Sequence, residues 1–561
     1  MKHFALVSFL SVCLFACSFG QRQIDPSILK VSAAMSAIEN LYVDTIDRNK
    51  LAEDAIIGLL EKLDPHSNYL TPEEVKAMNE PLQGNFEGIG VQFNMLTDTL
   101  YIEQVIPGGP SEKVGIMAGD RIIFVNDTSI AGVKMKNSDI MSRLRGTKGT
   151  TVNVKIKRGN NPNLLVFKIV RDKIPIYSLD ASYMIDDETA YIKLNRFAAT
   201  SYDEFMKAIK ELREKGMKNL IFDLQSNGGG YMNAAIDIAN EFLKWGDLIV
   251  YTEGAHQERR ESRASYKGSL EMGKVIVLVD ESSASASEIV SGALQDWDRA
   301  VIVGRRTFGK GLVQSPIPLP DGSMIRLTVA RYHTPTGRSI QKPYEKGNTE
   351  LYYKEIFSRL DKGEMTNVDS IHFLDSLKYN TLVNRRTVYG GGGIMPDCFV
   401  PLDTTRFTHL YRSLFASGTI YKFVMNTIDK NRTSYQKKYS DFESFNKYFT
   451  VDEDLLSDLL KLYKEEKKKN TIDKTEGVSN STEENAEGEP DEQTFDFTEV
   501  DMEQFEISKS LIQNHIKAMI ARDLWHLSEY YQIFNKENNT LKRAIQIIKS
   551  DEEYNKLLGK N

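Results

Sequence analysis

Apolar residues near the start of the chain recur three or four positions apart, as Ile28 and Val31 do. This spacing places them on one face of a helix. A second stretch with the same spacing ends at Asp64-Pro65, because proline cannot continue a helix. We therefore predict a helical N-terminal region over residues 21–83.

The pattern changes in residues 84–173, where short runs of β-branched and aromatic residues are separated by Gly, Pro and Asn. Such runs, bounded by turn residues, are typical of strands. We predict strands at residues 90–93, 100–105, 121–125, 151–157 and 164–170. This region is expected to form a β-rich module.

Strands alternate with helices from about residue 180 to residue 340. The predicted strands are 190–194, 219–224, 274–279 and 300–303, and the predicted helices are 202–215, 231–243 and 285–296. This alternation is typical of βα units around a sheet. We assign a core domain to residues 174–402, with a polar, helix-prone insertion at 344–385.

Beyond the core, residues 403–561 are predicted to be helical, most clearly at 455–462 and 505–530. Between these two stretches, residues 464–492 are rich in Lys, Glu, Asn, Ser and Gly and almost free of large apolar residues. That composition favours a flexible linker.

The first 20 residues have the pattern of a secretory signal: an early lysine, an apolar run too short to span a bilayer comfortably, and then small residues. Two processing events fit it. One is cleavage after Gly20, and the other is lipidation at Cys17, which would associate the protein with a membrane. No later segment is apolar enough to span a membrane, so we expect an exported protein of the periplasm or cell envelope.

Length and composition limit the number of domains and the possible classes of function. At ~150 residues per domain, 561 residues suggest several domains. A net charge of −7 without a long basic run argues against nucleic acid as the main partner. Two of three cysteines lie in the signal segment, which leaves Cys398 without an intrachain partner. Neither Cys-x-x-Cys nor His-Glu-x-x-His is present, so we predict no metal site, and the serine chemistry considered below needs no cofactor.

Candidate chemistry begins where the predicted strand 274–279 ends, at the serine-rich segment 281–288. Ser285 and Glu288 have the spacing of a capping box, which is a purely structural interpretation. A serine on a strand-to-helix turn also suits a nucleophile. The amide of Ala286 would then point outward beside the positive end of a helix and could stabilise an oxyanion.

A nucleophilic serine needs a base. His256 lies in a polar stretch and His333 has no nearby Asp in sequence, so neither resembles a triad member. Lys310, in Thr-Phe-Gly-Lys-Gly, follows the next predicted strand and would reach the same edge of the sheet. Burial would lower its pKa enough for it to act as a base, as in Ser–Lys dyads.

A third candidate is the glycine run 228–230, on the loop after the predicted strand 219–224. Three glycines before a helix can surround an oxyanion, although a tight turn is the simpler interpretation. An amide from Gly229 or Gly230 is a natural second donor to an oxyanion near Ser285.

Taken together, these motifs resemble the carboxyl-terminal processing (tail-specific) serine peptidases. The resemblance covers about residues 41–397, and its motifs are Asp-Leu-x-x-Asn-x-Gly-Gly, Ser-Ala-Ser-Ala-Ser-Glu-Ile, Gly-Ala-Leu-Gln-Asp, Thr-Phe-Gly-Lys-Gly-x-Val-Gln, Leu-Asp-Pro-His-Ser, Pro-Thr-Gly-Arg-Ser-Ile-Gln and Gly-Ile-Met-Pro-Asp. It implies a crotonase/ClpP-like α/β peptidase core with an inserted PDZ-like module and helical N- and C-terminal regions.

The resemblance also implies roles for single residues: Ser285 as nucleophile, Lys310 as general base, Gln314 as the polar partner that orients the lysine, and the amides of Gly229 and Ala286 as the oxyanion hole. Gln225 and Gly228 depart from the usual Arg and Pro of the glycine loop. The insertion and the helical tail lie outside the common core.

The β-rich module resembles a PDZ domain. Gly88, Ile89, Gly90 and Val91 occupy the place of the carboxylate-binding loop, and the later Pro-Gly-Gly-Pro and Gly-Asp-Arg-Ile segments follow in the expected order. A PDZ domain adds a peptide as an extra strand and captures its terminal carboxylate with backbone amides. We expect Ile89, Val91 and Leu144 to line an apolar side-chain pocket.

The sequence thus predicts an exported serine endopeptidase that recruits protein or peptide substrates by their free C-termini and cleaves through an acyl-enzyme. A non-catalytic peptide- or lipid-binding protein on the same fold is the alternative, but such a protein should lack the serine or the lysine. A crotonase-like acyl-CoA enzyme is disfavoured by the PDZ-like module. A homo-oligomer and an adaptor protein both remain open.

Overall fold

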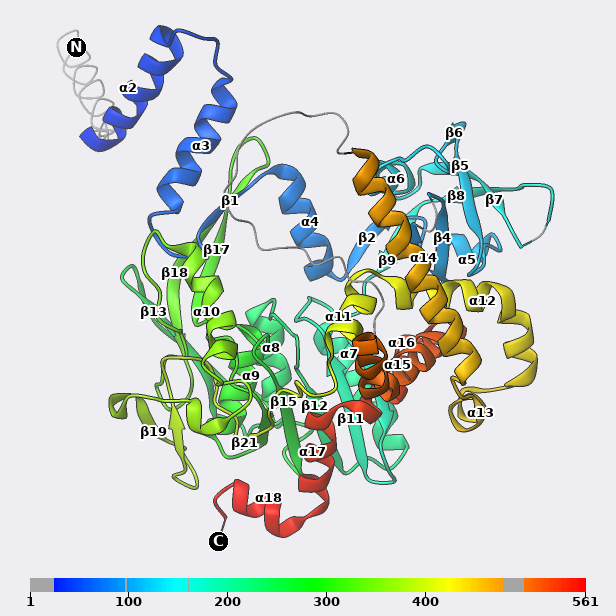
Figure 1. Cartoon of the computed structure of the whole chain (residues 1–561). Helices are drawn as coiled ribbons and strands as arrows, with labels where there is room; N and C mark the ends of the chain where they lie inside the picture. Colours follow the sequence, from blue (N-terminus) through cyan, green and yellow to red (C-terminus); the bar gives the residue numbers. More distant parts are fainter. Residues whose placement is uncertain (1–24, 96–97, 160, 478–498, 561) are drawn as a thin grey trace, which may run out of the picture.

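The structure is a computed structural model, and it describes residues 25–95, 98–159, 161–477 and 499–560. The predicted signal segment, with Cys17 and Gly20, lies outside these residues. In Figure 1 the β-rich module and the helical C-terminal region lie on one side of the α/β core, and the first two described helices project from the opposite side.

The N-terminal region is helical as predicted. It comprises α2 (Pro26–Leu41), α3 (Arg48–Leu60), the short strand β1 (Asn68–Leu70) and α4 (Pro72–Gln83). The carboxylates of Asp25 and Asp47 cap α2 and α3, and Thr71 with Glu74 forms a capping box on α4. No residue of α2 is buried, and the helix stands away from the body of the protein (Figure 1).

The β-rich module is an antiparallel sheet in the order β3-β4-β5-β7-β8, with β6 beside β5. Its elements are β2 (Asn85–Gly88), β3 (Val91–Met95), β4 (Leu100–Val105), α5 (Pro110–Lys113), β5 (Arg121–Val125), β6 (Thr128–Ser129), α6 (Asn137–Leu144), β7 (Thr151–Lys157), β8 (Leu165–Val170) and β9 (Asp172–Pro175). Strands β2 and β9 pair with each other, so the chain enters and leaves the module side by side.

The core contains a six-stranded sheet in the order β10-β11-β12-β15-β16-β21, in which all neighbours after the antiparallel β10–β11 pair are parallel. The strands are β10 (Leu179–Met184), β11 (Thr189–Leu194), β12 (Asn219–Asp223), β15 (Val275–Val279), β16 (Val301–Gly304) and β21 (Cys398–Phe399). The alternation of strands and helices in the sequence predicted this parallel arrangement.

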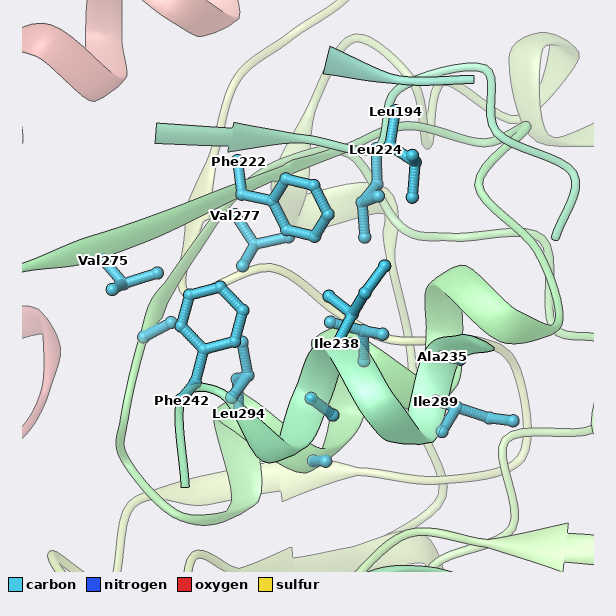
Figure 2. Close-up of a cluster of buried hydrophobic side chains, with 14 of the residues drawn as sticks. Leu194, Phe222, Leu224, Ala235, Ile238, Phe242, Val275, Val277, Ile289 and Leu294 are labelled. Atoms are coloured by element: carbon cyan, nitrogen blue, oxygen red, sulfur yellow. The ribbon is translucent and has the colours of Figure 1, made fainter. Parts of the chain in front are cut away.

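One face of this sheet packs against α7 (Ser201–Glu214), α8 (Met232–Asn240) and α9 (Ala286–Asp296). Phe222 and Val277 point from the strands towards Ile238 of α8 and Leu294 of α9 (Figure 2). Alternate strand residues such as Ile276 point to the other face. Burial on both faces explains why these strands read as continuous apolar runs.

The other face is covered by the last two helices of the chain, α17 (Asn539–Lys549) and α18 (Asp551–Leu557). Leu541 and Ile548 of α17 and Tyr554 of α18 are buried against the strands. The sequence placed these helices in a separate C-terminal region, but their apolar faces complete the core.

A second sheet, in the order β1-β18-β13-β14 with β17 beside β18, packs next to the core. It is built from β13 (Leu248–Gly254), β14 (Gln257–Arg263), β17 (Leu312–Pro318) and β18 (Met324–His333), and β1 joins it from the N-terminal region. The insertion contributes α10 (Thr349–Asp361), the 3-10 turns Val368–Ser370 and Asp375–Leu377, and β19 (Lys378–Asn380), which pairs with β20 (Thr387–Tyr389) just beyond the insertion.

The C-terminal region forms its own apolar cluster of helices. They are α11 (His409–Ala416), α12 (Thr419–Lys438), α13 (Phe442–Tyr448), α14 (Glu453–Gly477), α15 (Glu499–Leu524) and α16 (Leu527–Phe534), followed by the 3-10 turn Asn535–Glu537. The linker prediction was wrong for residues 464–477, which belong to α14; Lys and Glu are good helix formers. Residues 478–492 lie outside the described residues. No described helix is both long enough and apolar enough to cross a bilayer.

Candidate active site

The candidate site lies where three neighbouring parallel strands end. The glycine loop follows β12, the Ser285 turn follows β15, and the Lys310 loop follows β16. Parallel strands present their carboxyl ends at one edge of a sheet, which is where ligands bind in open α/β sheets. The order of the strands therefore brings together three motifs that are far apart in the sequence.

Ser285 is the residue immediately before α9 and has a backbone φ of +56°. This region is unfavourable for residues with a side chain, and such strain is concentrated at functional sites. The side chain is half-buried and lies beside the positive end of α9. Ser285 and Glu288 form the capping box that their spacing predicts, and the Glu288 carboxylate accepts from the Ser285 amide.

Glu288, fully buried in the first turn of α9, connects the serine turn to the lysine loop. One carboxylate oxygen accepts from the amides of Ser285 (2.8 Å) and Lys310 (2.9 Å). The other accepts from Thr307 Oγ1 (2.5 Å) and the amide of Gly309 (2.7 Å). Burial raises the pKa of Glu288 to about 7, and these four donors oppose the rise.

Lys310 is mostly buried, and burial is the main reason that its pKa falls from 10.5 to about 8. The positive charge of Arg326 lowers this pKa further, whereas Glu288 and Asp64 raise it. The hydroxyl of the buried Tyr332 lies 2.7 Å from the carbonyl oxygen of Lys310 and 3.1 Å from that of Ser285. Within the described part of the chain, no hydrogen bond joins Lys310 Nζ to Ser285 Oγ.

Gln314, predicted to orient the lysine, lies four residues further along, on β17. Its side-chain amide donates to the carbonyl of Leu312 (3.0 Å) and to Thr328 Oγ1 (3.4 Å). Among the described residues it makes no hydrogen bond to Lys310, so the expected direct contact is not present in this state.

The glycine loop packs directly on the serine turn. Gly229 has a φ of +100°, and a Cβ there would come within 2.8 Å of Ser285 Cβ and 3.0 Å of the Ala286 amide nitrogen. The amide of Gly229 donates to Asn227 Oδ1 (2.9 Å). Among the described residues, the amides of Ala286 and Gly230 have no acceptor. Of the two glycine amides that the sequence offered, the free one is therefore that of Gly230, whereas the resemblance implied Gly229.

Sequence reasoning missed His66, a buried histidine contributed by the N-terminal region. Burial is the main cause of its low pKa of about 3, and the charge of Lys310 also lowers it. The Leu-Asp-Pro-His-Ser motif, which contains this histidine, is the sequence feature that could have identified it. The two histidines considered as bases from the sequence have other surroundings: His256 is exposed, and His333 stacks on Tyr251 at 4.7 Å between ring centroids.

In the β-rich module, the segment 88–91 links β2 to β3 and borders an apolar cavity of about 330 Å³. Ile89, Val91 and Leu144, the expected pocket residues, all line it, together with Phe86, Gly90, Phe93, Asn137, Met141 and Arg145. The amides of Ile89 and Gly90 have no acceptor within the described ranges. A loop with free amides beside an apolar pocket is the arrangement that binds a peptide C-terminus.

Comparison with known families identifies four parts of the chain. Peptidase family S41 matches residues 188–348, a PDZ domain matches 88–169, the activating protease CtpB N-terminal domain matches 18–74, and a family of unknown function matches 410–487.

Similar proteins include the carboxy-terminal-processing protease of Bartonella bacilliformis, 37% identical over 54% of this chain and 70% of that protein. The carboxy-terminal processing protease CtpB of Bacillus subtilis is 35% identical over 60% and 70%, respectively. Among solved structures, a photosystem II D1 C-terminal processing protease is 29% identical over 56% of this chain and 90% of that one, with a TM-score of 0.32. The chain therefore belongs to the carboxy-terminal processing proteases, which are serine-type peptidases of family S41, and carries a PDZ domain.

Proposed function

We propose that the chain is an exported endopeptidase in which Ser285 is the nucleophile and Lys310 the general base. The observation that carries this proposal is the buried Glu288 carboxylate, which hydrogen-bonds the backbones of both residues. It fixes the serine turn and the lysine loop against each other, as a dyad requires.

In the first step, neutral Lys310 takes the proton of the Ser285 hydroxyl while Oγ attacks the scissile carbonyl carbon. The resulting oxyanion accepts hydrogen bonds from the Ala286 amide and from the glycine loop, where the Gly230 amide is free. The C–N bond then breaks, and the lysine ammonium gives its proton to the leaving amine. Water, activated by the lysine, hydrolyses the acyl-enzyme ester.

The pKa values favour the lysine over a histidine. With a pKa of about 8, roughly a tenth of Lys310 is neutral at pH 7, and this fraction rises with pH. His66, with a pKa of about 3, is a far weaker base. Activity should therefore increase from neutral to mildly alkaline pH. A rate profile controlled by a group that titrates near pH 6.5 would contradict the lysine as base.

The PDZ domain supplies substrate selection in this proposal. The segment 88–91 would bind a free terminal carboxylate, and the adjoining cavity would take an apolar side chain. The PDZ domain of a carboxy-terminal protease from Vibrio cholerae has been solved in complex with peptide, and it is 32% identical over 16% of this chain and 97% of that one, with a TM-score of 0.15. Amidation of the substrate C-terminus should therefore slow cleavage.

We also propose a periplasmic or cell-envelope location, from the signal-like residues 1–20. The mature chain would begin at Gln21, or at a lipidated Cys17. The intact mass of native material distinguishes these two forms, and a chain that still carries Met1 contradicts export.

The central test is the degradation of unfolded casein by the purified protein. Ser285→Ala and Lys310→Ala should each abolish turnover and keep the fold, as measured by circular dichroism. Because the two residues act as a unit, the double variant should be scarcely worse than either single one. Turnover by Lys310→Ala would refute the dyad. Binding of C-terminal peptides without cleavage by the unaltered protein would favour a binding protein.

A further inference from the structure

A buried turn from the N-terminal region, residues 64–67, lies beside the candidate site. Asp64 Oδ1 accepts from the amides of His66 (2.9 Å) and Ser67 (3.1 Å), and Oδ2 accepts from Ser67 Oγ (2.6 Å). All three residues are less than a tenth exposed. The turn is thus rigid on its own and is held inside the protein, although it precedes the PDZ domain in the chain.

One hydrogen-bonded route runs from this turn to Gln314. Thr328 Oγ1 donates to Asp64 Oδ1 (2.9 Å), and the Thr328 amide donates to Ser67 Oγ (3.0 Å). The same Thr328 hydroxyl oxygen accepts from the Gln314 side chain (3.4 Å). The glutamine that follows the lysine loop is therefore held by Thr328, which is itself held by the turn.

A second route runs to the lysine loop through the insertion. His66 Nε2 lies 3.1 Å from the hydroxyl of Tyr352 on α10, and Gln341 Nε2 donates to that hydroxyl (3.4 Å). Gln341 Oε1 accepts from the amide of Gly311 (2.8 Å). The turn is thereby connected to the residue next to Lys310.

The titratable and charged groups around Lys310 come from three elements. Arg326 of β18 is positive, and Glu288 of α9 is acidic. Asp64 of the turn is acidic as well, while His66 stays neutral near physiological pH because burial lowers its pKa to about 3. Asp64 is therefore one of the two carboxylates that favour the protonated lysine.

We propose that the 64–67 turn is a positioning element for the catalytic lysine: it fixes the 310–314 segment through Thr328 and Tyr352 and places the Asp64 carboxylate in the field of Lys310. This inference rests on the proposed role of Lys310 as general base. It assigns the N-terminal region and α10 of the insertion a part in the chemistry, although both lie outside the sheet that carries the nucleophile.

Asp64→Asn tests the charge with little change of shape. The amide Oδ1 can keep the three hydrogen bonds that the carboxylate Oδ1 accepts, and the amide nitrogen can donate to Ser67 Oγ, which now donates to Oδ2. Without the negative charge, the protonated lysine is less favoured and its pKa falls. The midpoint of the rise of kcat/KM with pH should move to lower pH, by about 0.5 to 1 unit. The matched control, Asp321→Asn at the exposed turn between β17 and β18, should leave the midpoint unchanged.

Tyr352→Phe tests the second route, because it removes only the hydroxyl that His66 and Gln341 share. We expect kcat to fall about fivefold with KM unchanged. An unmoved midpoint in a folded Asp64→Asn variant overturns the proposal. If that variant does not fold, an unchanged kcat in Tyr352→Phe overturns it. Retained turnover in Lys310→Ala is a different result, and it refutes the dyad itself.

Discussion

Glu288 in the core and Asp523 on α15 are both buried carboxylates, but their surroundings are opposite. Each oxygen of Glu288 accepts two hydrogen bonds. Neither oxygen of Asp523 accepts any from the described residues, and the guanidinium of Arg522 lies 3.8 Å away. An unpaired buried carboxylate costs free energy, whereas a fully hydrogen-bonded one holds its neighbours in place.

Asp523 lies near the contact between the PDZ domain and the C-terminal helices. Tyr101 of β4 is buried in the helical cluster. Nearby, the Gln104 side chain donates to the carbonyl of Arg522 (2.8 Å), and Arg121 pairs with Asp429 (2.6 Å). The contact thus combines good hydrogen bonds with a buried carboxylate that accepts none from the described residues, although the positive charges of Arg522 and Arg432 act on it.

The comparison suggests that the region around Glu288 is rigid, whereas the contact between the PDZ domain and the C-terminal helices can move. The hydrogen bonds of Glu288 leave the serine turn and the lysine loop little freedom, which suits groups that must meet within fractions of an ångström. At the PDZ contact, burial of Asp523 without hydrogen bonds opposes ionisation of that carboxyl, and a contact that carries such a cost suits a domain that moves when a substrate docks. Three substitutions test this difference, beginning with the one that should have the largest effect.

Glu288→Gln should disrupt the rigid region most severely. Whichever way the glutamine is oriented, its NH2 group faces two hydrogens in place of an acceptor. We expect kcat to fall about 100- to 1,000-fold and the unfolding free energy to fall by about 2 to 4 kcal/mol. Casein turnover and chemical denaturation measure these effects. The control is Glu281→Gln on the same turn, whose carboxylate pairs with Arg305, and it should change kcat less than threefold. Equal effects of the two variants would contradict the special role of Glu288.

Met141→Asp should alter substrate selection and leave the core intact. Met141 lines the PDZ cavity, and a carboxylate there would lose apolar contact and repel the substrate terminus. We expect kcat/KM for a peptide with an apolar free C-terminus to fall about tenfold to 100-fold. Met117→Asp, at an exposed site of the same domain outside the cavity, should behave like the unaltered protein. If both variants cleave at the unaltered rate, the cavity does not recruit substrate.

Asp523→Asn should have the smallest effect and should stabilise the protein. Burial raises the pKa of Asp523 to about 7, above its unfolded value of about 3.9. Between these two values the unfolded carboxyl ionises first, so stability falls as pH rises, and the loss is complete above pH 7. Because asparagine does not titrate, Asp523→Asn does not lose this stability as pH rises. Its Tm should exceed that of the unaltered protein by about 2 to 4 °C at pH 8 and by little near pH 4.5. A difference in Tm that does not depend on pH would contradict this explanation.

Much of this architecture could be predicted from local sequence. The strands at 100–105, 121–125 and 151–157 have the predicted bounds, because Gly, Pro and Asn turn residues mark their ends clearly. The placement of Ser285 and Lys310 at one edge followed from the parallel topology. Short-range patterns were sufficient for these features.

Features that depend on distant partners could not be predicted in this way. The capture of the Gly229 amide by Asn227 is a detail of loop conformation. The sequence assigned α17 to a separate helical region, whereas its residues are buried against the strands of the core. The contact of His66 with Tyr352 joins two segments that no local pattern relates.

That last contact also bears on how the protein folds. His66 and Tyr352 are separated by 286 residues, and the whole PDZ domain lies between them. Closing so long a loop costs conformational entropy before the contact contributes to stability. Contacts of this kind therefore form late in folding. A chain that has folded only its PDZ domain and its sheet would still lack the packed surroundings of the lysine. Peptidase activity should therefore be acquired last, after the rest of the molecule is already compact.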